Sequence, residues 1–209
     1  NDLDEIAPLI SLGGPIAGDD IVDASEVTTV TFSGTSDEEG GLVTLTLDDG
    51  LSPIFFNPTV SSGLWSVTVD LTGLQEGSVI VTADISDVAG NAAIQASSTI
   101  TLDYSLPTIS GTTNPSIVEN TTIVGMYNAD EAVTWSLSGD DASLFTIDGS
   151  GNVSFITAPD FEVPSDLNTD NVYDLVVEGT DASINVGILA VAVTITDEDE
   201  NAPAFSSAM

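Results

Sequence analysis

The 209-residue sequence contains no lysine, arginine, histidine or cysteine, whereas aspartate and glutamate together number 34 and give a formal charge of −34. Without basic side chains to neutralise phosphate groups, binding to nucleic acids or to anionic membrane surfaces is excluded. Without cysteine, disulfides and thiolate metal sites are excluded, and without histidine the chemistry of soft metals is excluded too. Only oxygen ligands remain, and these suit hard cations such as calcium.

Long apolar runs are also missing, and none approaches the ~18 residues of a membrane helix. No signal peptide is visible, so an export signal is expected to lie outside this segment. The apolar fraction is nevertheless 42%. Because disorder needs low hydrophobicity together with high charge, we expect a folded chain with real cores.

Apolar and polar residues alternate along most of the chain, which predicts half-buried strands separated by glycine-rich and aspartate-rich turns. The first set of expected strands covers residues 26–35, 41–49, 64–74, 78–87 and 96–103. The second set covers residues 121–127, 132–139, 144–156, 172–181 and 187–197, with a hairpin turn at 148–151 and at most a short helical turn at 139–145. The sequence therefore predicts an all-β protein of two tandem antiparallel β-sandwiches.

Three similar junctions divide the chain at intervals of roughly a hundred residues. Each has an acidic residue, a short spacer, a proline and a return to apolar residues, at 4–10, 102–109 and 199–205. Proline stiffens such a junction and cannot extend the preceding strand. We expect one domain at residues 1–104 and a second at 105–209, as part of a longer tandem array.

The motifs of the two halves resemble two known repeat families. The first half, with APLISLGGPIAGDDIVDASE (7–26), GLWSVTV (63–69) and ADISDVAGN (83–91), resembles the bacterial Ig-like repeats of giant secreted adhesins. The second half resembles cadherin-like repeats through IVENTTIVG (117–125), NADEAVTWSL (128–137), LFTIDGSGNVSF (144–155), APDFE (158–162), EGTDAS (178–183) and DEDENAP (197–203). The resemblance implies an Ig-like sandwich followed by a cadherin-like sandwich.

The stretch TDEDENAPAF (196–205) places four acidic residues side by side. Like charges about 4 Å apart repel by roughly 4 kcal/mol at an effective dielectric near 20, and the chain has no basic side chain to relieve this repulsion. Calcium binds about six to eight oxygens and would supply the missing charge. The cadherin-like resemblance implies a calcium site formed by Glu119, Asp160, Glu162, Asp197, Asp199 and Glu200. Asp199 and Glu200 stand where the family's D-x-N-D-N linker has Asn and Asp, which changes both charge and reach.

A second calcium site is expected at the boundary between the two domains. By the family pattern, the upper end of the second domain offers Asn128, Asp130 and Asp181, with Asn128 replacing the usual Asp. In an Ig-like sandwich, the A–B and C–D loops face the following domain. The resemblance therefore places Asp19, Asp20 and Asp23, together with Asp48 and Asp49, toward the linker. Asp103 in the linker is the expected bridging ligand, and at least one calcium ion is predicted here.

Two other features of the sequence are less informative about function. Asp166, Asn168 and Asp170 are spaced as in the first half of an EF-hand loop, but the glycine and the bidentate glutamate of that loop are missing. This pattern therefore ranks below the junction sites. Trp65 and Trp135 lie in alternating strands, which predicts core positions and not ligand platforms.

Catalysis is not expected. Serine nucleophiles lack a histidine or lysine base, and a catalytic carboxylate pair needs a cleft that small sandwiches do not offer.

We expect the chain to form calcium-rigidified extender modules of a large bacterial cell-surface adhesin, which project a distal binding domain. The expected protein is extracellular and monomeric, and its expected partners are neighbouring domains of the same chain. The alternative is a cadherin-like module that itself binds a protein or glycan partner in a calcium-dependent way.

Overall fold

The computed structural model describes residues 5–199. The chain divides into two compact units, unit 1 (Asn1–Ser105) and unit 2 (Leu106–Met209). Regular structure in the described part is almost entirely β-strand, apart from the short 3₁₀ helices η1 (Ile16–Gly18) and η2 (Ala142–Leu144). The all-β prediction is confirmed. Across residues 5–199, no helix combines the length and the apolar character needed to cross a membrane.

Unit 1 forms two sheets from its strands. The strands are β1 (Ile21–Val22), β2 (Val30–Thr35), β3 (Thr44–Asp48), β4 (Ile54–Phe56), β5 (Leu64–Val69), β6 (Gly77–Asp84) and β7 (Ala96–Leu102). One sheet has the order β1-β7-β6-β3-β4 and the other pairs β2 with β5. Neighbouring strands are antiparallel, as predicted, except that β1 runs parallel to β7.

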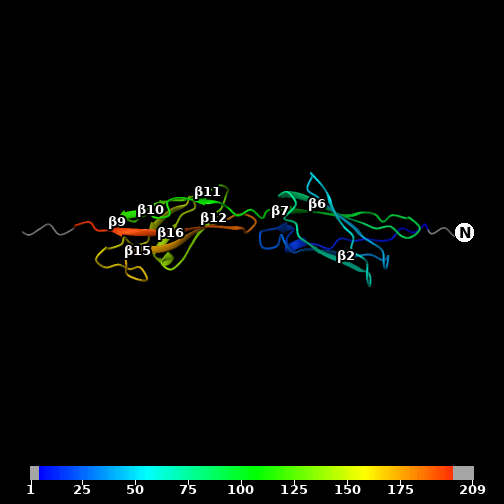
Figure 1. Cartoon of the computed structure of the whole chain (residues 1–209), viewed down its shortest axis with the longest axis horizontal. Coiled ribbons are helices and arrows are strands. Elements are labelled where there is room, and N and C mark those ends of the chain that lie inside the picture. The colour runs from blue at the N-terminus through cyan, green and yellow to red at the C-terminus, as the bar shows by residue number, and fades with distance from the viewer. Residues whose placement is uncertain (1–4, 200–209) are drawn as a thin grey trace, which may run out of the picture. The chain divides into compact units, whose positions relative to one another are not determined.

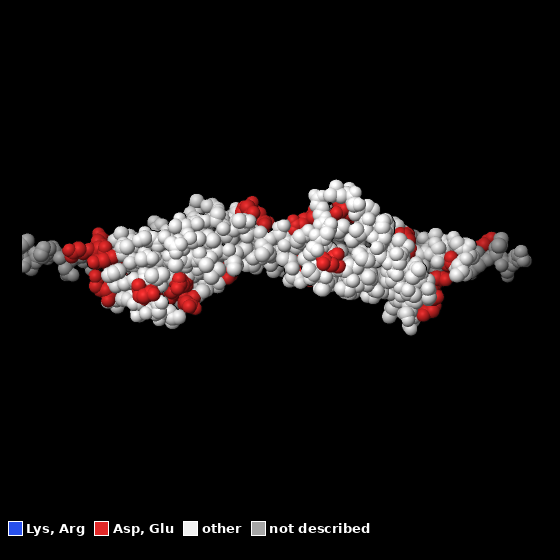
Figure 2. All heavy atoms as spheres, in the orientation of Figure 1, with Lys and Arg blue, Asp and Glu red and all other residues white. Residues whose placement is uncertain are grey.

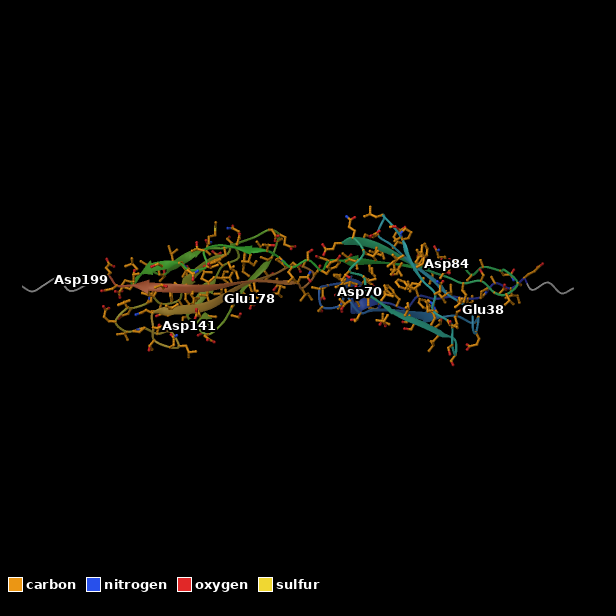
Figure 3. All side chains as sticks on the ribbon, in the orientation of Figure 1. Glu38, Asp70, Asp84, Asp141, Glu178 and Asp199 are labelled. Carbon is orange, nitrogen blue, oxygen red and sulfur yellow. The ribbon has the colours of Figure 1, made fainter. Side chains whose placement is uncertain are left out.

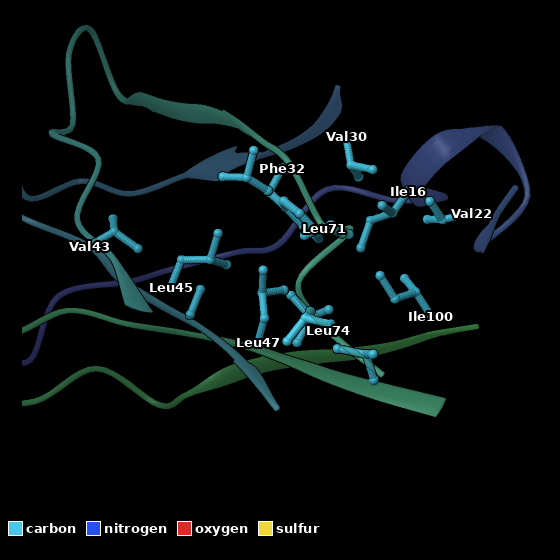
Figure 4. Packing of buried hydrophobic residues seen from close by; sticks show 14 of the residues in the cluster. Ile16, Val22, Val30, Phe32, Val43, Leu45, Leu47, Leu71, Leu74 and Ile100 are labelled. Atoms are coloured by element: carbon cyan, nitrogen blue, oxygen red, sulfur yellow. The ribbon is translucent and has the colours of Figure 1, made fainter. Parts of the chain in front are cut away.

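The core of unit 1 lies between these sheets and follows the alternation seen in the sequence (Figure 4). In β3, Leu45 and Leu47 are fully buried, and in β2 Phe32 is fully buried. The neighbouring residues along each strand are more exposed and face outward. Trp65 is buried as predicted, and its indole N–H donates a hydrogen bond to the Ser11 carbonyl at 3.2 Å. The buried ring thus satisfies its polar atom, as a core tryptophan needs.

Unit 2 forms a larger sheet and two smaller ones. Its strands are β8 (Ile109–Ser110), β9 (Ser116–Val118), β10 (Ile123–Met126), β11 (Asn128–Ala129), β12 (Thr134–Ser138), β13 (Phe145–Ile147), β14 (Asn152–Phe155), β15 (Val172–Thr180) and β16 (Val186–Thr196). The larger sheet has the order β12-β15-β16-β9, and β9 is parallel to β16 (Figure 1). The smaller sheets have the orders β10-β14-β13 and β11-β8.

Three aromatic rings form the centre of the unit 2 core. The ring centroids of Phe145 and Phe155 are 4.1 Å apart, and Tyr173 meets Phe155 edge-on at 5.0 Å. Trp135 is half-buried and packs against the buried core of unit 2, as expected for a core-facing strand residue. The predicted turn at residues 148–151 joins β13 to β14.

Candidate metal centre

Three segments that are distant in sequence meet at the end of unit 2 toward which β16 runs. Glu119 directly follows β9, and Asp197 directly follows β16. Because β9 and β16 are parallel neighbours with Val118 opposite Thr196, the next residue of each strand comes to the same place. The third segment is the loop that contains Glu162. Figure 2 shows a group of acidic atoms covering this end of the unit.

Glu119 is the structural centre of this group. Its side chain is fully buried, and its two carboxylate oxygens accept hydrogen bonds from the Phe161 N–H at 2.8 Å and the Glu198 N–H at 2.9 Å. A buried carboxylate requires such partners, because an isolated ion in the interior costs several kcal/mol or more. Glu119 therefore ties β9 to both other segments and fixes its own orientation.

The carboxylates of Glu119, Glu162 and Asp197 converge, and one oxygen from each lies within 4.8 Å of the others. At that separation, each pair of charges repels by about 3 kcal/mol at an effective dielectric near 20. Glu162 and Asp197 are exposed, so water weakens the repulsion, but Glu119 is shielded from water. Three convergent carboxylate oxygens fit a calcium ion, which completes its shell with carbonyls and water. Among the described residues, no other group of three acidic side chains comes this close.

The remaining residues predicted for this site have different positions. Asp160 accepts hydrogen bonds from the N–H groups of Glu162 and Val163, both at 3.0 Å, and so shapes the loop that presents Glu162. Asp199 lies beyond the end of β16, exposed, at the same end of unit 2 (Figure 3). Glu200 lies outside the described residues.

The acidic residues predicted in unit 1 each cap a turn of the backbone. Asp19 accepts a hydrogen bond from the Ile21 N–H at 3.0 Å, and Asp20 accepts one from the Ile16 N–H at 2.8 Å. Asp23 accepts bonds from the N–H and the hydroxyl of Ser25. The pKa of Glu26 is raised by partial burial and then by the nearby charges of Asp23 and Asp19, so negative charge accumulates in this part of the unit. Asp103 follows β7, and its N–H donates to the Val22 carbonyl.

Of the three residues predicted for the upper end of unit 2, Asp130 and Asp181 accept hydrogen bonds from the backbone, and Asn128 lies in a strand. Asn128 is in β11, paired with Ser110 of β8. Asp130 accepts a 2.7 Å hydrogen bond from the Thr108 N–H, and this bond lowers the pKa of the Asp130 carboxyl. Asp181 is buried and accepts bonds from the Ser183 N–H at 2.8 Å and the Asn185 N–H at 2.9 Å.

Two more carboxylates are buried: Asp141, which the sequence does not single out, and Asp166, which it indicates only as part of the lower-ranked EF-hand-like pattern. Asp141 accepts hydrogen bonds from the N–H groups of Leu167 and Asp174, both at 2.8 Å, although it follows an exposed turn. Asp166, the first residue of the EF-hand-like pattern, is 3% exposed and accepts the Asp170 N–H at 2.8 Å. In a chain without basic residues, peptide N–H groups are the main available partners for a buried carboxylate. No sequence signal shows that these two carboxylates are buried and bonded to backbone N–H groups.

A recurrent turn also pairs an aspartate carboxylate with N–H groups instead of a basic side chain. In three D-x-x-x-N segments, the Asp carboxylate accepts hydrogen bonds from the backbone N–H and the side-chain carboxamide of the Asn: Asp87 with Asn91, Asp148 with Asn152, and Asp181 with Asn185. The Asn carboxamide is the largest cause of the lowered pKa of Asp87 and of Asp148. Many of the acids thus stabilise turns and do not bind metal.

No family model matches the chain, and no curated protein matches it. Among solved structures, a Ca²⁺-stabilized adhesin that helps an Antarctic bacterium bind ice superposes with a TM-score of 0.51 and 24% identity, covering 91% of this chain. The chain shares its fold with that adhesin. It spans 49% of the adhesin structure, about half its length.

Other structural neighbours belong to the two repeat types that the sequence motifs resemble. Drosophila N-cadherin EC1-3 aligns with a TM-score of 0.40 and 18% identity over 95% of this chain and 70% of that chain. A bacterial immunoglobulin-like domain from the M. primoryensis ice-binding adhesin aligns with a TM-score of 0.32 and 27% identity over 46% of this chain and 96% of that one.

Proposed function

We propose that the chain consists of calcium-rigidified extender modules of a large bacterial cell-surface adhesin, with an Ig-like domain followed by a cadherin-like domain. The single observation that supports this most is the fully buried Glu119, which meets Glu162 and Asp197 in a protein without one basic side chain. The shared fold with a calcium-stabilized adhesin supports the same proposal.

The residues of the centre have separable tasks in this proposal. Calcium, when bound, supplies the positive charge that the chain lacks. Glu119 holds β9, the loop at Phe161 and the segment after β16 together through its two hydrogen bonds. Asp160 orders the loop so that Glu162 faces Asp197. The end of unit 2 toward which β16 runs then becomes stiff, and in an extender module a stiff end holds a distal domain away from the cell surface.

The site at the boundary of the two units remains a prediction. Its proposed ligands are Asp103, Asn128, Asp130 and Asp181, with the acidic loop of unit 1. Calcium titration by calorimetry tests it through the stoichiometry. We expect at least two ions per chain, and Glu119→Gln is expected to remove one and leave the other.

Rigidification is tested by small-angle scattering of the full chain in calcium and in chelator. We expect the chelated protein to show the broader distribution of intramolecular distances, because unscreened acidic junctions repel and let the domains hinge. A sample in which sodium chloride replaces calcium at the same ionic strength controls for general electrostatic screening. Superimposable profiles in calcium and chelator would contradict the proposal.

An enzymatic role is not part of this proposal, and the neighbours described above are adhesion modules. We place the protein outside the cell, at the bacterial surface, as part of a longer tandem chain. Its constant partners are then the neighbouring domains. Binding of an external protein or glycan by unit 2 is the alternative function, and a binding screen of the chain with and without calcium distinguishes the two.

A further inference from the structure

The outer face of the larger sheet in unit 2 carries an apolar stripe along β16. Alternation directs Val186, Ile188, Ala190 and Ala192 to this face, away from the core. Ile188 is 67% exposed, and no polar residue interrupts the stripe before Thr194. The matching positions of β12, in contrast, are serine and threonine. Contiguous exposed apolar surface is a feature of interaction sites, whereas apolar residues scattered singly are ordinary.

A groove of about 470 Å³ crosses the stripe where its side chains are smallest. Its floor contains Val176, Ala190 and Ala192, which lie side by side because Val176 pairs with Ala190 in the sheet. One wall is the turn at Gly139. This turn lies directly against β15, since a Cβ at Gly139 would come within 3.0 Å of the Leu175 Cα. Larger side chains at the two alanines would fill the groove.

Acidic side chains line one side of the groove. Asp140 and Asp174 both border it, and both are exposed. Within the described part of the chain, neither carboxylate accepts a hydrogen bond, whereas Glu178 on the same face is held by the Ser136 and Ser138 hydroxyls. Asp140 and Asp174 therefore keep their full capacity to accept hydrogen bonds from an incoming group.

We propose that this groove binds an extended segment of a partner protein that carries lysine or arginine next to compact apolar residues. The alanine floor accommodates apolar side chains and the methylene stem of the basic residue, while Asp140 and Asp174 receive its charged end. The chain itself contains no basic residue, so the cation must come from another molecule. This inference concerns a different surface from the metal centre and does not depend on it.

Two other occupants fit the chemistry less well. A second copy of this chain would bring acids against acids without any basic group to compensate, which disfavours a self-contact. A glycan usually stacks on an aromatic ring, and no aromatic side chain is among the described residues that line the groove. Charge and shape together favour a basic peptide.

The test measures binding of a fluorescein-labelled peptide of alternating lysine and leucine to the full chain in calcium-containing buffer, by fluorescence anisotropy. Ala190→Leu fills the groove and is expected to weaken binding about tenfold. Asp174→Asn removes one exposed charge and is expected to weaken binding about two- to fivefold. Glu5→Gln removes an exposed charge in unit 1 as the matched control and should leave affinity unchanged. A peptide of alternating lysine and serine should bind more weakly than the leucine peptide.

Equal affinities for all three variants would overturn the proposal, because the peptide would then respond only to the overall negative charge. A dimer in sedimentation experiments that dissociates upon Ala190→Leu would also overturn it, since the stripe would be a self-contact. Far-ultraviolet circular dichroism of each variant verifies that the sheet is intact, and Asp174→Asn tests the proposal independently should Ala190→Leu disturb it.

Discussion

Substituting Glu119 by glutamine should change the free energy of unfolding by different amounts in calcium and in chelator. The side chain keeps its shape but loses its charge and one of its two acceptor oxygens. In chelator, the loss of repulsion toward Glu162 and Asp197, up to about 3 kcal/mol per pair before screening, offsets the lost hydrogen bond to Phe161 or Glu198, about 1–3 kcal/mol. We therefore expect Glu119→Gln to lie within about 1 kcal/mol of the wild type without calcium.

Calcium should separate the two proteins. At a hundredfold excess over its dissociation constant, an ion bound only to the folded state adds about 2.7 kcal/mol. Glu119→Gln removes a charged ligand and most of this gain. For a unit of about 100 residues, a difference near 2 kcal/mol corresponds to about 10 °C in melting temperature. Differential scanning calorimetry of the full chain in calcium and in chelator measures this difference.

Glu178→Gln is the matched control. Glu178 belongs to the same unit and accepts hydrogen bonds from two serine hydroxyls, but it lies outside the cluster of three acids. Its substitution should shift the melting temperature equally in calcium and in chelator. If Glu119→Gln behaves in the same way, with equal loss in both conditions, Glu119 has only a structural role and the reasoning is refuted.

Three further predictions concern other parts of the molecule. Phe32→Ala should cost unit 1 about 3–5 kcal/mol because the ring is fully buried, and calorimetry should show one transition shifted and the other unchanged. Gly139→Ala should destabilise unit 2 by about 1–3 kcal/mol in denaturant titrations, since φ is +104° and a Cβ would meet Leu175; a neutral result would contradict the close approach. The depressed pKa values of Asp87 and Asp148 give stability that is complete above the ordinary aspartate pKa of about 3.9 and is lost as pH falls through the depressed values. Asp148→Asn should therefore flatten the dependence of unfolding free energy on pH in this acidic range, and an unchanged slope would argue against it.

Much of the fold follows from the period-two alternation. The strand around Leu45 and Leu47 and the hairpin at residues 148–151 form where alternation and turn residues indicate them. Alternation does not reveal which strands become neighbours. The parallel pairs of β1 with β7 and β9 with β16 join residues about 80 positions apart, and nothing local in the sequence encodes that contact.

The candidate metal centre was only partly accessible from the sequence. The cadherin-like motifs indicated Glu119, Glu162 and Asp197, and the structure brings these three together. The sequence does not show that Glu119 is buried and bonded to two backbone N–H groups, because both partners come from distant segments. Nor does it distinguish Asp160, which orders a loop, from an acid that faces the cluster. The sequence does not indicate that Asp141 and Asp166 have structural roles, because the partners of both carboxylates are backbone amides, which nearly every residue type provides.

In each unit an early strand pairs in parallel with the last strand, β1 with β7 and β9 with β16, and this pairing has a mechanical consequence. The chain enters at one end and leaves at the other, so a pulling force slides these strands along each other and loads their hydrogen bonds together. In unit 2 the paired stretch is long. It begins where the Ala192 N–H donates to the Thr113 carbonyl and ends where the Glu119 N–H donates to the Thr196 carbonyl. In unit 1 the paired stretch is shorter and reaches from the Asp20 carbonyl, which accepts from the Thr101 N–H, to the Val22 carbonyl, which accepts from the Asp103 N–H. Under tension, unit 1 is therefore expected to yield first, and unit 2 to keep its length at higher force.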